Sequence, residues 1–553
     1  MKLQDGFVGW PELFAAKYRS EGCWNGWTLY AYLRDSQERF ADKTAIVDDN
    51  VRLSYTELLK LVDRLAQRLY EKGFRPQDTV VIQLPNRWEL VVFLFACLRL
   101  GLVPVMALPG HRAFEIGYFI DHVEAKGLAI PDSLRSFDHL GMGIELKGRC
   151  PTLSTLFVLN SGQSELDSGA IDLDQLILAG DDQVDPQKLA TDLGPSSEEI
   201  ALFLLSGGTT GVPKLIPRTH DDYGYNFRIS SERCRFSADT VYGTFLPASH
   251  NFPLACPGIL GTLHLGGTVV MGRSPEPSYA LSLIEKEGIT VTAVVPAVAQ
   301  KWLEHFSSNP KYNLSSLDVL QVGGARMAPE LAFRVGPVLG CKLQQVFGMA
   351  EGLVNYTDLD DPEETICETQ GRPMSPFDEI RIVDEQGAEV PEGEMGQLLT
   401  RGPYTLRGYY RAPEHNQKAF TDDGWYRTGD VVRRDSSGSL VVLGRTKDLI
   451  NRAGEKISGE EIENLLYRIS NVEHAAVVSL PDAQKGELVC AVIVLKDKDK
   501  TLTLDSLRSE FDRFEIAGYK YPERLELVDE LPLTNVGKID KAKLRSELLS
   551  SSN

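Results

Sequence analysis

The order of apolar and polar positions predicts a repeated strand–helix–strand arrangement along most of the chain. The apolar run TVVIQL (79–84) is followed by NRWELVVFLFACLRLG (86–101), which is long enough for a helix, and then by the strand-like VPVMAL (103–108). The same order recurs at 289–306 and at 317–340. Short apolar strands that alternate with helices form βαβ units, in which parallel strands are covered by helices. We therefore predict an α/β fold built on parallel sheets.

The pattern changes between residues 372 and 445. This segment is rich in glycine and alternates apolar with polar residues, as in GEMGQLLTRGPYTLRGYY (393–410). Such alternation is typical of antiparallel strands, so we predict a β-rich subdomain here. A helix, two strands and a helix follow, up to about residue 550. We predict a large N-terminal domain, 1–445, and a small mobile α+β C-terminal domain, 446–553.

Bulk composition narrows the class of protein. A chain of 553 residues is too long for one hydrophobic core, and its net charge of −20 argues against general nucleic-acid binding, which needs a basic surface. The eight cysteines show no paired spacing, so we predict reduced thiols in a cytoplasmic protein. The N-terminal residues lack the apolar segment of a signal peptide, and the most apolar stretch (90–110) is interrupted by Arg99 and Pro104. We therefore predict no membrane span.

A phosphate-binding segment follows the apolar run IALFLL (200–205). Its sequence, SGGTTGVPK (206–214), has the small residues, hydroxyls and lysine that bind anions. A P-loop requires lysine directly after the last glycine and a hydroxyl after the lysine, but Val212 and Pro213 follow Gly211 here. The segment therefore predicts a different kind of phosphate loop, in which the contacts come from Ser206, Gly207, Gly208, Thr209, Thr210 and Lys214.

Five further motifs follow in order along the chain. They are QVGGARM (321–327), QQVFGMAEG (344–352), GWYRTGD (424–430), GRTKDLINRAGEKIS (444–458) and LPLTNVGKIDK (531–541). A single Glu351 beside a phosphate loop suits Mg²⁺, which takes one or two carboxylates together with phosphate oxygens. Asp430 suits the two hydroxyls of a ribose, and Arg445 suits a phosphate or ribose. Each motif alone is a weak to moderate signal: a strand-to-helix turn explains QVGGARM better, and a lone glutamate is usually a surface residue.

Together and in this order, the motifs resemble those of the adenylate-forming enzymes, which include acyl- and aryl-CoA ligases, luciferase and the adenylation domains of peptide synthetases. The resemblance extends over about residues 25 to 545. It implies an acyl-adenylate-forming fold, ATP and Mg²⁺ as cofactors, and a C-terminal domain that rotates about a hinge at Lys447.

The resemblance also implies a role for each matching position. Lys538, Glu351 and His250 would serve catalysis, with Glu351 as the metal ligand. The remaining nucleotide contacts would come from Gly324, Ala325, Arg326, Gln345, Val346, Phe347, Gly348, Asp430 and Arg445. The family commonly has Tyr-Gly-x-Thr-Glu where this chain has Phe347-Gly348-Met349-Ala350-Glu351, which leaves the partners of the α-phosphate open.

The segment LPASHNFPLACPG (246–258) bears on the acid that is activated. It is similar to that of the stand-alone 2,3-dihydroxybenzoate–AMP and salicylate–AMP ligases of siderophore biosynthesis. That subgroup implies an aryl acid bound by His250, Asn251, Phe252, Cys256, Gly323, Val346 and Val354, with Asn251 on the 2-hydroxyl. Cys256 favours salicylate because a thiol is a weak partner for a 3-hydroxyl, whereas Val354 favours 2,3-dihydroxybenzoate. The two residues disagree, and we give 2,3-dihydroxybenzoate a slight preference.

No carrier domain is recognisable in the 553 residues, so the resemblance implies that an aryl carrier protein with a phosphopantetheine thiol binds in trans. Arg452, Gly454 and Lys456 would then face the pantetheine. An aryl-CoA ligase remains an alternative, and so does a nucleotide-binding regulator without catalytic activity.

Overall fold

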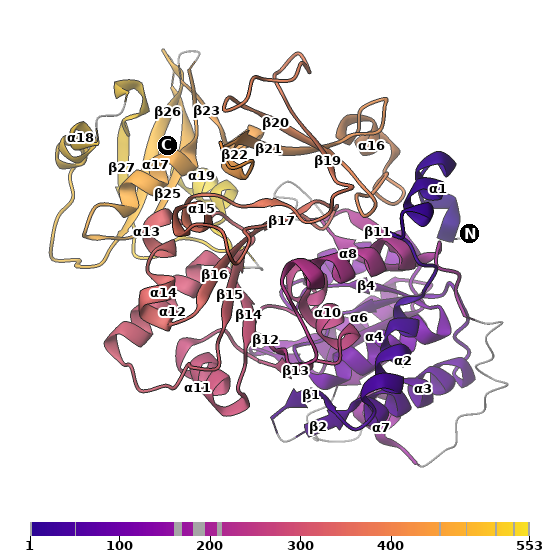
Figure 1. The fold of residues 1–553 in the computed structure, drawn as a ribbon. Coiled ribbons are helices and arrows are strands. Elements are labelled where there is room, and N and C mark those ends of the chain that lie inside the picture. The colour runs from indigo at the N-terminus through magenta and orange to yellow at the C-terminus, as the bar shows by residue number, and fades with distance from the viewer. Residues whose placement is uncertain are drawn as a thin grey trace.

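Two large sheets form the first part of the computed structural model, which describes residues 3–49, 51–159, 169–180, 194–206, 213–452, 455–482, 484–514, 517–534 and 537–550 (Figure 1). The nine-stranded sheet has the order β18-β17-β16-β15-β14-β12-β13-β1-β2. Its strands are β1 (Thr44–Asp48), β2 (Val51–Ser54), β12 (Val241–Thr244), β13 (Thr268–Met271), β14 (Val291–Val294), β15 (Val319–Gly323), β16 (Lys342–Gly348), β17 (Val354–Tyr356) and β18 (Arg372–Pro373).

The seven-stranded sheet has the order β11-β10-β4-β3-β5-β8-β9. Its strands are β3 (Thr79–Ile82), β4 (Val103–Met106), β5 (Gly127–Pro131), β8 (Thr155–Leu159), β9 (Ile171–Asp172), β10 (Ile200–Leu205) and β11 (Leu215–Thr219). The central strands of both sheets are parallel, and antiparallel pairs occur only toward the edges of the two sheets as described. The predicted parallel α/β architecture is confirmed.

Helices lie between the two sheets and also cover their outer faces. The largest buried cluster joins strands of both sheets to α2 (Leu29–Phe40), α3 (Tyr55–Glu71), α4 (Trp88–Leu100) and α10 (Gly258–His264). A second cluster packs α5 (Ala113–Val123) and α6 (His139–Arg149) on the seven-stranded sheet. A third packs α11 (Pro277–Glu287), α12 (Pro296–Ser308), α13 (Pro329–Ala332) and α14 (Val335–Leu339) on the nine-stranded sheet. Other helices are α1 (Glu12–Ser20), α7 (Leu173–Leu178), α8 (His220–Arg233), α9 (Asn251–Ala255) and α15 (Glu363–Glu368).

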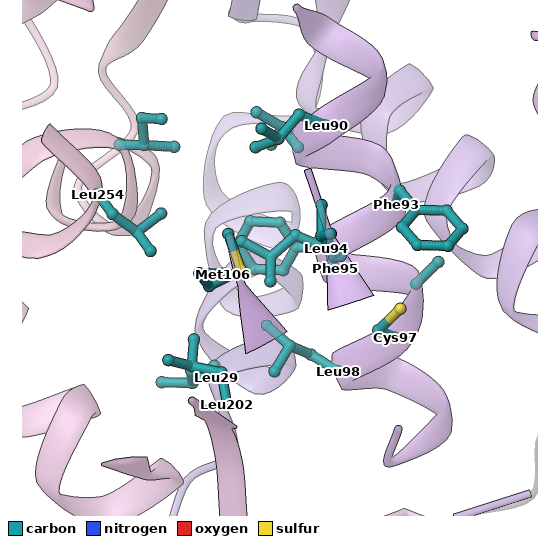
Figure 2. Packing of buried hydrophobic residues seen from close by; sticks show 14 of the residues in the cluster. Leu29, Leu90, Phe93, Leu94, Phe95, Cys97, Leu98, Met106, Leu202 and Leu254 are labelled. Atoms are coloured by element: carbon teal, nitrogen blue, oxygen red, sulfur yellow. The ribbon is translucent and has the colours of Figure 1, made fainter. Parts of the chain in front are cut away.

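Helix α4 explains the most apolar stretch of the sequence. Figure 2 shows its side chains packed against α2, β4, β10 and α9 through Leu29, Met106, Leu202 and Leu254. A helix that is apolar on every side belongs in a core that surrounds it. It ends at Gly101, whose φ of 76° is a left-handed conformation that glycine adopts without strain. Across the described part of the chain, no helix combines the length and the apolar character needed to cross a bilayer.

The predicted β-rich subdomain is also present. Strands β19 (Glu379–Val383), β20 (Met395–Arg401), β21 (Tyr426–Arg434) and β22 (Leu440–Arg445) form an antiparallel sheet, and α16 (Pro413–Ala419) lies between β20 and β21 in the chain. Each strand pairs with its neighbour in sequence, as alternating apolar and polar runs separated by turns predict.

The C-terminal part has its own sheet and helices. Strands β23 (Ile450–Arg452), β24 (Glu455–Ile457), β25 (Val472–Asp482), β26 (Gly486–Leu495) and β27 (Arg524–Leu527) form this sheet. Helices α17 (Gly459–Tyr467) and α18 (Leu504–Arg513) pack on one face, and α19 (Lys541–Ser550) packs on the other. The predicted order of helix, two strands and helix did not include β27, because four largely half-buried residues give no clear alternation. The small α+β unit is confirmed.

Candidate active site

The base of the phosphate-binding segment is a closed hairpin. Strands β10 and β11 pair antiparallel, the Ser206 amide donates to the Lys214 carbonyl at 2.9 Å, and the Lys214 amide donates to Ser206 Oγ at 2.9 Å. Gly207, Gly208, Thr209 and Thr210 lie outside the described residues. The hairpin therefore holds the two ends of the predicted loop together. It also brings Lys214 Nζ within 6.0 Å of the centre of the Tyr409 ring.

Glu351 is a buried carboxylate beside this loop. Only 7% of the residue is exposed, and the Tyr409 hydroxyl donates to its Oε1 at 2.8 Å. The Tyr426 hydroxyl lies 2.9 Å from that of Tyr409. Burial raises the pKa of Glu351, while the hydrogen bond from Tyr409 and the charge of Arg445 lower it. The described residues contain no cluster of three or more histidines, cysteines and carboxylates arranged for a metal, so a cation at Glu351 would depend on ligands from elsewhere.

Asp430 and Arg445 face each other across the last two strands of the antiparallel sheet. They are register partners in β21 and β22, and Arg445 Nε lies 3.1 Å from Asp430 Oδ1. Oδ2 of Asp430 is buried and has no hydrogen-bond partner within the described ranges. Burial raises the pKa of Asp430, and the charge of Arg445 opposes that effect. A free carboxylate oxygen in a buried position is an acceptor that a hydroxyl ligand can satisfy.

Lys538 reaches this group from the C-terminal part of the chain. A Cβ placed on Gly324 would lie 3.2 Å from Lys538 Cε and 3.8 Å from its Nζ. Burial and the charge of Arg445 lower the pKa of Lys538 to about 8, against the attraction of Asp430 and Glu351. The side chain is therefore still mostly a charged ammonium at neutral pH, but it loses its proton at a lower pH than an exposed lysine does.

The glycines at the end of β15 allow a close approach between strands and side chains. A Cβ on Gly323 would lie 2.8 Å from the Val346 carbonyl and 3.0 Å from the ring of Phe252. Gly324 has a φ of 84°, which favours glycine, and Ala325 after it is exposed. The absence of a side chain at Gly323 therefore allows β15 to lie close to the Val346 carbonyl and the Phe252 ring.

Two predicted adenine neighbours have side chains that bond backbone carbonyl groups. Arg326 donates to the carbonyl oxygens of Val442 at 3.3 Å and Glu368 at 3.4 Å. Gln345 Nε2 donates to the carbonyl oxygens of Ile366 and Cys367 at 2.7 and 3.0 Å. Both side chains thus hold neighbouring segments in place.

Phe347 and Gly348 complete the adenine-side motif at the end of β16. The Phe347 ring is half-buried against the cluster under the antiparallel sheet, and Gly348 is exposed. A Cβ on Gly348 would lie 3.1 Å from a methyl group of Val354, which places this motif beside one of the predicted aryl-acid residues.

The predicted aryl-acid residues gather in one buried cluster. Phe252, Cys256, Val346 and Val354 belong to it, and Asn251, 6% exposed, begins α9 beside them. Asn251 Oδ1 accepts from the Tyr223 hydroxyl at 2.9 Å, and its Nδ2 donates to Cys256 Sγ at 3.4 Å. Phe252, Val346 and Val354 are apolar, and Asn251 contributes an uncharged amide.

His250 caps α9 and stays neutral. Its Nδ1 accepts from the Phe252 amide at 3.2 Å, and burial together with the charge of Lys538 lowers its pKa to about 4. Because Nδ1 accepts a backbone N–H, the proton of the neutral ring is on Nε2, which leaves one donor. His250 is therefore a hydrogen-bond donor at neutral pH rather than a cation.

The predicted pantetheine-facing residues are described only in part. Arg452 donates to both carboxylate oxygens of Glu523, at 2.9 and 3.0 Å, and Lys485 contacts the same carboxylate. Gly454 and the side chains of Lys456 and Lys447 lie outside the described residues.

Sequence reasoning missed several polar residues of the site. Tyr409 bonds Glu351 and is itself bonded by Tyr426. Tyr223 bonds Asn251, and Arg218 Nη1 donates to the Ala350 carbonyl at 2.8 Å. A tyrosine in a glycine-rich β segment, such as RGYY (407–410), gives no local signal of its partner. These contacts depend on packing between distant segments.

Comparison with known proteins identifies the family of the chain. A family model described as AMP-binding enzyme matches residues 33–410, and one described as AMP-binding enzyme C-terminal domain matches residues 461–538. The chain is 53% identical over 542 residues to a Streptomyces sp protein named salicylyl-CoA synthase / salicylate adenylyltransferase, covering 98% of this chain and 97% of the relative.

A second relative and a solved structure agree with the first. The 2,3-dihydroxybenzoate-AMP ligase of Bacillus subtilis (strain 168) is 47% identical over 544 residues, covering 98% of each chain. The apo structure of MbtA from Mycobacterium smegmatis is similar with a TM-score of 0.75 and 42% identity, covering 99% of each chain. The first family model spans well over half of the chain, and these relatives align over almost all of it. The chain therefore belongs to the AMP-binding enzymes and is an adenylate-forming ligase that uses ATP.

Proposed function

We propose that the enzyme activates salicylate, a 2-hydroxybenzoate, to its aryl-adenylate with release of pyrophosphate. The aryl group then passes to the phosphopantetheine thiol of an aryl carrier protein in siderophore biosynthesis. The observation that carries the proposal is the buried amide of Asn251, which lies beside the apolar side chains of Phe252, Val346 and Val354. A neutral amide suits an ortho hydroxyl, whereas an α-ammonium substrate requires an anion at this place.

The surroundings of Cys256 support salicylate over 2,3-dihydroxybenzoate. Burial raises the pKa of this thiol to about 12, against hydrogen bonds from Asn226 and Asn251. A 3-hydroxyl placed there would meet a weak partner that is already hydrogen-bonded. The 53% identical relative is also named for salicylate, and the 47% identical one for 2,3-dihydroxybenzoate. These observations reverse the slight preference that the sequence alone supported.

In the first half-reaction, the acid carboxylate attacks the α-phosphorus of ATP. The bond from that phosphorus to the bridging oxygen breaks, and pyrophosphate leaves. The Lys538 ammonium would bond both the carboxylate and an α-phosphate oxygen, which offsets their repulsion as they meet. Asp430 would accept hydrogen bonds from the ribose hydroxyls through Oδ2, the oxygen left without a partner among the described residues. Ser206 and Lys214 would hold the β- and γ-phosphates.

The residues at Glu351 fit a magnesium ion. Its carboxylate is buried, ionisable and oriented by Tyr409, and a single carboxylate with phosphate and water ligands is a common Mg²⁺ environment. When bound, Mg²⁺ would neutralise charge that develops on the leaving pyrophosphate. Glu351 would hold the ion, and Tyr409 would hold Glu351.

The second half-reaction requires that Lys538 leave the site. Lys538 and Arg452 lie on the same small C-terminal unit, and we propose that this unit, residues 446–553, rotates about a hinge at Lys447. Rotation would bring Arg452, Gly454 and Lys456 to the incoming pantetheine. A thiolate then attacks the carbonyl carbon and AMP leaves.

The eight cysteines are buried free thiols, which supports a reducing, cytoplasmic setting.

A second candidate function is aryl-CoA ligase, because the 53% identical relative is named a salicylyl-CoA synthase. CoA and carrier protein present the same phosphopantetheine thiol. The two candidates therefore differ only in what surrounds that thiol.

We expect ATP–pyrophosphate exchange to be faster with salicylate than with benzoate by about tenfold or more, since benzoate has no ortho hydroxyl to bond the Asn251 amide. The same preparation, given salicylate, is then offered CoA or a phosphopantetheinylated aryl carrier protein. Faster transfer to the carrier supports the proposal, and transfer to CoA alone supports the second candidate. Equal exchange with benzoate and salicylate would contradict the role of Asn251.

Cys256→Ser is expected to shift preference toward 2,3-dihydroxybenzoate by about fivefold to tenfold. A serine hydroxyl is a stronger donor and acceptor than a thiol, so it can pair with the 3-hydroxyl. The ratio of kcat/KM values for the two acids measures the shift. Cys234→Ser is the matched control, since Cys234 is a buried thiol of the same cluster that bonds Gln321 rather than Asn251. An unchanged ratio in Cys256→Ser would show that residue 256 does not face the 3-position.

A further inference from the structure

Tyr223 contacts Asn251, a polar side chain of the proposed acid pocket. It lies on α8, is fully buried, and donates its hydroxyl to Asn251 Oδ1 at 2.9 Å. The other end of the same amide, Nδ2, donates to Cys256 Sγ at 3.4 Å. Buried neighbours thus bond both ends of the Asn251 amide: a donor faces the oxygen, and an acceptor faces the nitrogen.

The direction of these hydrogen bonds follows from what each partner is able to do. Within the described ranges, Asn251 Oδ1 is the acceptor recorded for the Tyr223 hydroxyl. With the amide reversed, Nδ2 would face Tyr223, and the buried phenolic proton would lose that acceptor, which is unfavourable. Reversal would also leave Oδ1 facing a thiol, which is a weak donor.

Arg218 strengthens the same direction. Its guanidinium lies 4.9 Å from the centre of the Tyr223 ring, and Nε bonds Asp222 at 2.6 Å in an ion pair that is almost fully buried. A cation over the ring face draws electron density from the phenol, which makes the hydroxyl a better donor and a poorer acceptor. Burial raises the pKa of Tyr223 well above its ordinary value, and Arg218 acts against that rise, so the phenol keeps its proton.

We propose that Tyr223 is a positioning residue that orients the Asn251 amide so that the pocket presents a hydrogen-bond donor to the ortho substituent of the acid. Among the residues that the structure describes, Tyr223 engages Oδ1 and Cys256 engages one N–H, so the second N–H of Nδ2 remains for a ligand. This inference rests on the proposed function and names which ortho groups that site accepts.

The consequence is selection by hydrogen-bond direction rather than by size. The phenol oxygen of salicylate accepts a hydrogen bond while its proton bonds the neighbouring carboxylate. Anthranilate has nearly the same shape, but the lone pair of its amino nitrogen is delocalised into the ring and accepts poorly. Its N–H groups would face the N–H of Asn251, and two donors in contact repel. A pocket oriented by Tyr223 therefore rejects the amine.

The test compares salicylate, anthranilate and benzoate as substrates of the full-length enzyme in ATP–pyrophosphate exchange. The wild-type ratio of kcat/KM for salicylate over anthranilate is expected to exceed about tenfold. Tyr223→Phe removes the hydroxyl and frees the amide to reverse, so the ratio is expected to fall by about tenfold. Benzoate has no ortho group, so its kcat/KM is expected to remain within about twofold of wild type.

Tyr225→Phe is the matched control. Tyr225 lies on the same helix, is equally a buried tyrosine, and bonds Ser375 at 2.7 Å instead of Asn251. It is expected to leave the salicylate-to-anthranilate ratio unchanged. A similar fall in both variants, or an equal loss with benzoate and salicylate in Tyr223→Phe, would assign Tyr223 a structural role and overturn the inference.

Two further measurements test the inference without relying on the activity of Tyr223→Phe: the wild-type ratio and the dissociation constants. A wild-type ratio near one overturns the inference, although aryl-acid activation would stand. If an enzyme shows no exchange, calorimetry still measures the dissociation constants of salicylate and anthranilate for wild type and Tyr223→Phe. The ratio of these two constants then replaces the ratio of kcat/KM values. The absence of exchange with every aryl acid refutes the proposed function, whereas the binding ratio separately supports or overturns the role of Tyr223.

Discussion

Lys538→Ala is expected to lower acid-dependent ATP–pyrophosphate exchange by about 10³-fold, the upper part of the range for losing one preorganised donor to a developing charge. The side chain lies over Gly324 and is electrostatically coupled to Asp430, Arg445 and Glu351. Transfer of the aryl group from preformed aryl-adenylate to the thiol is expected to remain within about fivefold of wild type, because that step forms no bond to the α-phosphate. Measuring the two half-reactions separately checks both statements.

The pH profile gives Lys538 a second signature. Its pKa is lowered to about 8, so the ammonium is present below that pH and is lost as the pH rises through it. The kcat/KM for adenylation, which reports the free enzyme, is expected to fall above about pH 8. Lys538→Arg keeps a positive charge, so the falling limb should move beyond about pH 10 even if the rate is lower.

An exposed lysine provides the control for Lys538. Lys543 lies on α19, five residues further along the chain, and pairs at the surface with Glu547 at 3.9 Å. Lys543→Ala is expected to keep exchange within about twofold of wild type, since exposed ion pairs contribute little. A comparable loss in Lys543→Ala, or equal losses of both half-reactions in Lys538→Ala, would contradict a specific role in adenylation.

Glu351→Gln is expected to reduce exchange by about 10²-fold at a fixed Mg²⁺ concentration and to raise the Mg²⁺ concentration needed for half-maximal activity. The amide keeps the shape and the position near Tyr409 but removes the negative charge that a hard cation prefers. Titration of exchange with Mg²⁺, after removal of metal with a chelator, measures both effects. The fold, monitored by thermal unfolding, should change little in comparison.

Tyr409→Phe tests how much the orientation of the Glu351 carboxylate contributes, apart from its negative charge. It deletes the hydroxyl that donates to Glu351 Oε1 at 2.8 Å and leaves the carboxylate in place. The expected loss is about fivefold, which corresponds to one ordinary hydrogen bond. If Glu351→Gln lost activity with an unchanged Mg²⁺ dependence, Glu351 would not be the metal ligand, and its role would be limited to holding Tyr409.

Local patterns in the sequence were sufficient for the architecture. The order of TVVIQL, a buried helix and VPVMAL became β3, α4 and β4, because strand and helix periodicities are written into consecutive residues. The glycine-rich alternation predicted over 372–445 became four antiparallel strands, β19 to β22, for the same reason. β27 was not predicted, because four largely half-buried residues are too few to show the alternation of apolar and polar positions that distinguishes a strand from a loop.

The sequence by itself determined which chemical groups this protein possesses and in what order, and hence its family, since motifs are short and depend on neighbouring residues. Only the tertiary structure decided which of those groups meet. Tyr409 bonds a carboxylate 58 residues away, Tyr223 bonds an amide 28 residues away, and Lys538 lies over Gly324 from another unit of the fold. It also turned the side chains of Arg326 and Gln345 toward neighbouring backbone carbonyl groups. Such pairings depend on how sheets and helices pack against each other. Local sequence patterns therefore do not predict which distant residue a buried side chain contacts.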